Sequence, residues 1–246
     1  MDSQLSIITG ICLIVGTFLS YFIQYFKLYR NKNNDGISHY MLVLGSLSSM
    51  TNFIGLISVE THDNVILILP LLQMITPWIC IFIFYSMFVY YAKKNHKIRL
   101  FTESLLLKTT DKNNYIFRNI KLGFFAYIII VIILWILFGF FSINYKNNTL
   151  YYYGQTMNII ASITSVSMWI PQIIKSWKLR ESGSLSIIAL AIHALGCIIT
   201  FVYQVFMSNQ SFYIGFPYLI GAILETSVIL LASTKICKRN NYLNNF

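Results

Sequence analysis

Seven long apolar stretches make up most of this chain and limit what it can fold into. Each is close to the roughly 20 apolar residues that a helix needs to cross the hydrocarbon core of a bilayer. Of the 246 residues, 57% are hydrophobic and 11% are charged, whereas about a quarter of an ordinary soluble domain is charged. The sequence therefore predicts an all-α, polytopic membrane protein with seven transmembrane helices, at about 5–28, 38–58, 65–91, 120–142, 152–177, 185–207 and 213–234.

The basic residues predict how these helices are oriented. The chain has 18 Lys and Arg against 8 Asp and Glu, a formal net charge of +10. Every basic residue except Lys146 falls on one side, after spans one, three, five and seven, and Lys and Arg accumulate on the cytoplasmic side of membranes. This distribution indicates a lipid surface rather than nucleic acid, with the N-terminus luminal or extracellular and the C-terminus cytosolic. The glycosylation sequons at Asn147 and Asn209 fall on the luminal side.

A polar motif occurs twice, 148 positions apart, after the first and the fifth apolar stretch. The copies at 21–38 and 169–186 align without a gap, and three of the matched pairs are identical: Gln24 with Gln172, Lys27 with Lys175, and Ser38 with Ser186. Such a repeat indicates two copies of one structural unit. Each set of three spans carries one motif, and the fourth span returns the second set to the orientation of the first. We therefore expect parallel three-helix repeats at 1–91 and 152–246, joined by a segment, 92–151, that holds a basic loop and a linker helix.

The doubled motif resembles the PQ-loop family of seven-helix membrane proteins, which includes cystinosin, the lysosomal basic amino-acid exporters, the sugar-transporting SWEETs and the KDEL receptors. The resemblance covers nearly the whole chain and implies the same 3+1+3 arrangement of helices. It also implies a secondary transporter of a small polar solute, with amino acids the best class, coupled to protons and working by alternating access. A lysosomal, vacuolar or other endomembrane location is favoured over the plasma membrane.

Pro171 and the two motif glutamines are the candidate hinge and gate residues. A proline inside a helix removes a hydrogen bond and kinks the helix. The resemblance implies that Pro171 is a hinge and that Gln24 and Gln172 act in gating; a static kink and simple interhelical hydrogen bonding are the alternatives. The first motif has Ile23 in place of the proline. The first helix is therefore expected to be straighter than the fifth.

Glu225 and His193 are the candidate proton-coupling residues. Glu225 lies midway along the seventh span, and a carboxyl group inside a membrane is costly enough to suggest a function. The resemblance supports it, because cystinosin-like transporters carry an acid at the corresponding place. His193 lies where those transporters have a proton-coupling aspartate, and histidine ordinarily titrates between about pH 5 and 8. The alternatives are a protonated carboxyl bonded to a neighbouring helix and a neutral, packed histidine.

Further polar side chains lie at membrane depth, among them Asn52, Asn158, Tyr203 and Gln204. Such groups face the interior of a helix bundle, because lipid offers them no hydrogen-bond partner. Asn52, Asn158 and Tyr203 are candidates for substrate contact, and a purely structural role is the alternative.

The sequence also bears on functions other than transport. A cargo receptor, sensor or scaffold on the same seven-helix fold is the main alternative, made plausible by the missing first proline. The sequence shows no nucleophile–base pair or cluster of metal ligands, so we expect neither an enzyme nor a cofactor or metal. The expected partners are a small solute, protons and the lipid bilayer. A cytosolic protein at loop 92–119 and a second copy of the chain are further options.

Overall fold

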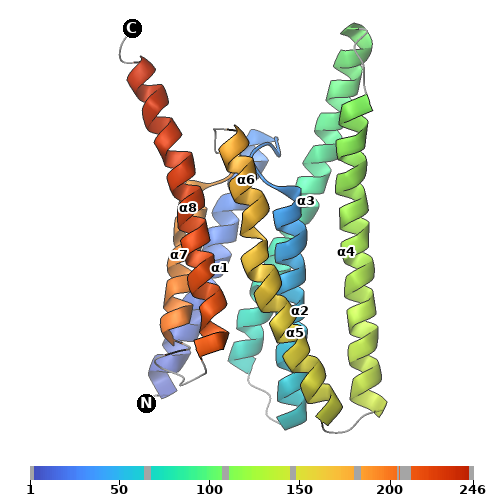
Figure 1. Ribbon diagram of the computed structural model, residues 1–246, viewed down its shortest axis with the longest axis vertical. Coiled ribbons are helices and arrows are strands. Elements are labelled where there is room, and N and C mark those ends of the chain that lie inside the picture. The colour runs from blue at the N-terminus through green and yellow to red at the C-terminus, as the bar shows by residue number, and fades with distance from the viewer. Residues whose placement is uncertain are drawn as a thin grey trace.

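The computed structural model describes residues 3–63, 68–106, 111–144, 148–179, 184–203, 205 and 212–243. In these residues the chain forms helices that lie side by side in one elongated bundle, with α1 beginning and α8 finishing at opposite ends (Figure 1). The helices are α1 (Ser3–Asn31), α2 (His39–Asp63), α3 (Ile68–Leu106), α4 (Asp111–Asn144), α5 (Asn148–Ser167), α6 (Trp169–Leu179), α7 (Ile187–Val202) and α8 (Phe212–Leu243).

The prediction of an all-helical, multi-pass membrane protein is confirmed. Six helical stretches in the described part of the chain are long and apolar enough to cross a membrane, and one of them combines α5 and α6. The remaining predicted span, 185–207, corresponds to α7, a shorter apolar helix of 16 residues. Part of that span, at 204 and 206–207, lies outside the described residues.

The predicted basic loop at 92–119 is largely helical, which corrects the expectation from the sequence. α3 continues to Leu106 and α4 already begins at Asp111, so both extend beyond their predicted spans. The segment contains neither Pro nor Gly, the residues that most often end a helix. Charge excludes these residues from hydrocarbon, but it does not stop the helix. Figure 1 shows the ends of α3 and α4 side by side at the upper end of the bundle.

Each half of the chain packs its third helix against its first two. In the first half α3 contacts α1 and α2, and in the second half α8 contacts α7 as well as α5 and α6. The halves meet where α2 packs on α5 and where α1 packs on α7. The first helix of each half therefore contacts the second helix of the other. α4 packs on α2 and α3, and its outward side exposes apolar residues such as Ile129, Ile132 and Ile136, as expected for a surface facing lipid.

The first helix of the second half is interrupted next to Pro171, whereas its counterpart in the first half, α1, is continuous. α5 ends at Ser167 and α6 begins at Trp169, so Pro171 lies in the first turn of α6. Pro171 has no N–H to donate to the carbonyl of Ser167, so the regular pattern is lost there. α1 runs unbroken for 29 residues through Ile23. The helix that contains the proline is therefore the interrupted one, and the helix with Ile23 at the matching position is the regular one.

α2 and α5 approach each other closely at two glycines, Gly55 and Gly154. A Cβ atom on Gly154 would lie 2.9 Å from the carbonyl oxygen of Gly55. About two helical turns from these glycines, the hydroxyl of Ser48 donates to the carbonyl of Ala161 at 2.9 Å. In a membrane, small residues of this kind allow helices to associate through van der Waals contact and interhelical hydrogen bonds. This crossing therefore joins the two halves of the protein.

We expect Gly154→Ala to destabilise the protein. Its added methyl group would meet the Gly55 carbonyl oxygen at 2.9 Å and Ser58 Cβ at 2.9 Å, so the helices must move apart. Overpacking of this kind costs about 1–3 kcal/mol. Thermal unfolding in detergent measures the effect, with Gly139→Ala as the control, because a Cβ there meets nothing within 4 Å. Equal unfolding midpoints for the two variants would contradict the proposed close contact.

Candidate functional site

Gln172 holds the loop that follows α1. Its side-chain Nε2 donates to the carbonyl of Gly36 at 2.8 Å, and its Oε1 accepts from the backbone N–H of Ser38 at 2.7 Å. Lys175, one turn further along α6, donates to the carbonyl of Ile37 at 2.6 Å. Gln172 is fully buried, so these hydrogen bonds are shielded from water. We call this set of contacts the Gln172 clamp.

Gln24 holds the loop before α7 in the same way. Its Nε2 donates to the carbonyl of Ser184 at 2.9 Å, and its Oε1 accepts from the backbone N–H of Ser186 at 2.7 Å. Lys27 donates to the carbonyl of Leu185. Gln24 is also buried. We call this set the Gln24 clamp.

The two clamps are related by the sequence repeat, and each crosses from one half of the protein to the other. Every atom of the Gln172 clamp has its counterpart 148 positions away in the Gln24 clamp. A further backbone hydrogen bond, from Ser184 N–H to the Asp35 carbonyl at 2.8 Å, joins the two loops directly. Together these contacts close the bundle at one end, which we call the loop end (the upper end in Figure 1).

A small cavity of about 70 Å³ lies between the halves next to the Gln24 clamp. Its lining comes from α1, α2, α3, α6 and α7 and from residues next to these helices, and it includes Gln24, Tyr21, Phe84, Trp169 and His193. Pockets that bind small molecules usually measure about 300 Å³ or more. At about 70 Å³ the cavity has room for water-sized molecules but not for a larger solute in this conformation.

His193 lies at this cavity and contacts Glu225. The His193 Nδ1 atom of α7 is 2.7 Å from Glu225 Oε1 of α8. The histidine ring contacts the rings of Tyr21 and Trp169, with centroid distances of 6.3 Å in both cases. Tyr21 and Trp169 are themselves equivalent positions of the repeat. The pair therefore joins α7 to α8 at the boundary between the two halves, and the structure brings together the two residues that the sequence suggested for proton coupling.

Cys197 completes a cluster that the sequence analysis missed. Its sulfur lies 3.8 Å from His193 Nδ1 and 3.9 Å from Glu225 Oε1. The donor atoms of the three residues all lie within 4.8 Å of one another. The available signal was the spacing of His193 and Cys197, which places both side chains on one face of a helix. Glu225 could not be assigned to them because it is 28 positions away on another helix.

A comparison with protein-family models confirms the resemblance suggested by the doubled motif. The PQ loop repeat model matches the chain twice, at residues 5–62 and 153–213. The chain carries two PQ loop repeats. The first match contains Gln24 and the second Gln172, so each carries one of the two clamp glutamines. Comparison with curated proteins gives no match.

Asn52 and Asn158 of this PQ-loop protein lie away from the cavity lining. Asn52 Nδ2 is 3.1 Å from the sulfur of Met74 on α3. Asn158 fills the space above Gly55, where its Oδ1 lies 2.1 Å from the position of an added Cβ atom. Both amides therefore contact a neighbouring helix, and their contact with a solute stays a prediction.

Tyr203 caps the C-terminal end of α7, where its backbone N–H donates to the carbonyls of Ile199 and Thr200. Asn147 and Asn209 lie outside the described residues.

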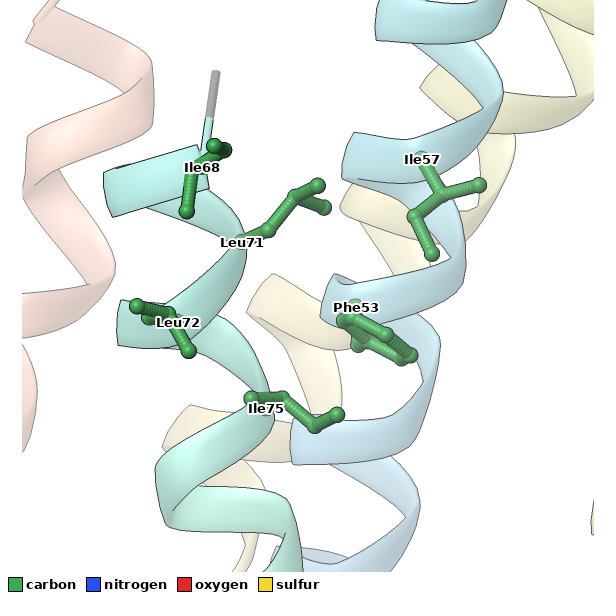
Figure 2. Close-up of a pocket in the computed structure, with 6 residues that line it drawn as sticks. All are labelled: Phe53, Ile57, Ile68, Leu71, Leu72 and Ile75. Carbon is green, nitrogen blue, oxygen red and sulfur yellow. The ribbon is translucent and has the colours of Figure 1, made fainter. Parts of the chain in front are cut away.

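A larger pocket of the PQ-loop protein lies far from the clamps, between α2 and α3. It measures about 240 Å³ and is lined by six apolar residues: Phe53, Ile57, Ile68, Leu71, Leu72 and Ile75. Figure 2 shows the side chains of the two helices around it. Binding sites for polar solutes need some polar groups for orientation, and this lining has none. It suits an acyl chain of the bilayer better than a polar solute.

Proposed function

We propose that this PQ-loop protein is a secondary transporter that carries a small polar solute, with an amino acid as the preferred class, together with protons. The observation that carries the proposal is the His193–Glu225 contact at the boundary of the two halves. Ionisable side chains at membrane depth are rare and mark the paths of ions, protons and substrates. Here one is an acid with no exposed surface and the other lines a cavity. No enzymatic step and no organic cofactor forms part of the proposal.

The proposed mechanism is alternating access between two three-helix units, 1–91 and 152–246, joined through α4. The packing of α3 and α8 against their own halves supports this 3+1+3 arrangement, as does the crossed contact of α1 with α7 and of α2 with α5. Opening the loop end requires both clamps to release. The interruption between α5 and α6 beside Pro171 supplies a place where the second half bends.

We further propose that the loop end faces the cytosol and that the N-terminus is luminal. The uneven distribution of basic residues supports this orientation. A lysosomal, vacuolar or other endomembrane is the proposed location. The basic helical extensions of α3 and α4 at 92–119 are then available to a cytosolic partner or to anionic lipid.

Uptake into vesicles that contain the purified protein tests the proposal. Radiolabelled amino acids and sugars are offered with and without an inward proton gradient, and empty vesicles serve as the control. We expect one class of solute, most readily amino acids, to accumulate faster with the gradient, and a protonophore to remove the difference. A folded protein that takes up none of them would contradict transport and support a cargo receptor, sensor or scaffold.

A further inference from the structure

The cluster of His193, Cys197 and Glu225 has the composition of a metal site. We propose that these three side chains bind a divalent transition-metal ion of the zinc type, between α7 and α8. Imidazole, thiolate and carboxylate groups are the ligands that Zn²⁺ takes in proteins, whereas Mg²⁺ and Ca²⁺ prefer oxygen alone. All three residues lie in the described part of the chain, where this cluster is buried or half-buried.

The distances within the cluster are close to those around a tetrahedral ion. With metal–ligand bonds of about 2.0–2.3 Å, neighbouring donor atoms of such a site lie roughly 3.3–3.6 Å apart. The contacts of Cys197 with His193 and Glu225 measure 3.8 and 3.9 Å, and the contact of His193 with Glu225 measures 2.7 Å. An ion therefore needs the first two contacts to shorten and the last to lengthen by a few tenths of an ångström. Side-chain rotation can supply such changes.

Glu225 gives a second reason to place a cation here. Its side chain is fully buried, and its Oε2 atom has no hydrogen-bond partner in the part of the chain that the structure describes. A buried oxygen without a partner typically costs about 1–3 kcal/mol, or more when it is charged. A cation held by both oxygens of this carboxylate would give Oε2 a partner. With a thiolate at Cys197 it would also leave the cluster without net charge, which favours burial in a membrane.

The surroundings of His193 leave space for a fourth ligand. The cavity that His193 lines, at about 70 Å³, exceeds the roughly 10–15 Å³ needed to hold one water molecule. Zinc sites with three protein ligands commonly complete their coordination with water. Of the three cluster residues, His193 is the one that lines this cavity, so the fourth ligand would enter beside its ring.

Absorption spectroscopy of the purified protein with Co²⁺ tests the site, because Co²⁺ replaces Zn²⁺ and reports a bound thiolate as a charge-transfer band. We expect one equivalent of Co²⁺ to give this band and Zn²⁺ to displace it. Cys197→Ser should remove the band and weaken Zn²⁺ binding by more than the about 10–100-fold lost with an outer-shell partner. Cys12→Ser is the matched control, since Cys12 is an exposed free cysteine on α1. A band that survives in Cys197→Ser, or that is never formed, would overturn the proposal.

The wild-type protein provides a second test that does not depend on the folding of a variant. Zn²⁺ should slow alkylation of Cys197 at least 10-fold and leave Cys12 unaffected, as read by mass spectrometry of the labelled peptides. Equal labelling of Cys197 with and without Zn²⁺ would refute binding at this site.

The functional consequence rests on the proposed transport of protons through His193 and Glu225. If these residues exchange protons during transport, bound Zn²⁺ should inhibit gradient-driven uptake, and Cys197→Ser should reduce that inhibition. The two proposals fail separately. Metal binding without any uptake would support the metal site and contradict transport. Uptake without a Co²⁺ band would support transport and contradict the metal site.

Discussion

Glu225→Gln is expected to reduce proton-driven uptake to the level seen without a pH gradient. Glutamine has nearly the shape of glutamic acid and can still hydrogen-bond to His193, which lies 2.7 Å from the carboxyl oxygen. Its side-chain amide, however, cannot take up or release a proton at the pH values of the uptake experiment. Coupling should therefore be lost while the protein stays folded. Vesicle uptake with an imposed gradient measures the loss, and solute exchange at equal pH on both sides shows whether binding survives.

Ser227→Ala is the matched control for this variant. Ser227 lies two positions further along α8, is half-buried, and donates a hydrogen bond from its hydroxyl to the Ile223 carbonyl of its own helix. We expect its uptake to match that of the wild type. If Glu225→Gln retains full stimulation by the gradient, the proton is carried elsewhere and the functional proposal loses the observation on which it rests.

The sequence predicted the membrane fold because that prediction depends on local composition. Long apolar stretches indicate segments that cross the hydrocarbon core, and the repeat indicates a duplicated structural unit. Hydropathy marks the edge of the hydrocarbon, however, and not the end of a helix. The extensions of α3 to Leu106 and of α4 from Asp111 were therefore mistaken for a loop.

The site was harder to predict because most of its contacts cross between the halves. Gln24 and Gln172 were visible as a repeated pair, but their partners are backbone groups, which leave no mark on residue type. Glu225 and His193 were visible as costly groups in apolar surroundings. Their contact with Cys197 depends on how α7 packs on α8, as the role of Asn158 depends on the glycine that faces it.

Removing the amide of Gln172 is expected to weaken the closed loop end strongly. In Gln172→Met the side chain keeps a similar length but makes neither hydrogen bond, so the Gly36 carbonyl and the Ser38 N–H lose their partners. At about 1–3 kcal/mol for each buried group left unsatisfied, the cost is roughly 2–6 kcal/mol. Thermal unfolding in detergent measures the loss of stability. Lys178→Met is the control, because Lys178 is an exposed residue of the same helix.

The repeat also predicts that the two clamps contribute equally to stability and depend on each other. If both close the same end of the bundle, Gln24→Met should cost about as much as Gln172→Met, since its contacts with Ser184 and Ser186 have nearly the same lengths. Once one clamp is removed and the loop end opens, the other clamp loses its geometry. The double variant should therefore be destabilised by less than the sum of the single variants. Additive effects would mean that each glutamine only anchors its own neighbouring loop, and that the halves are not closed by a common step.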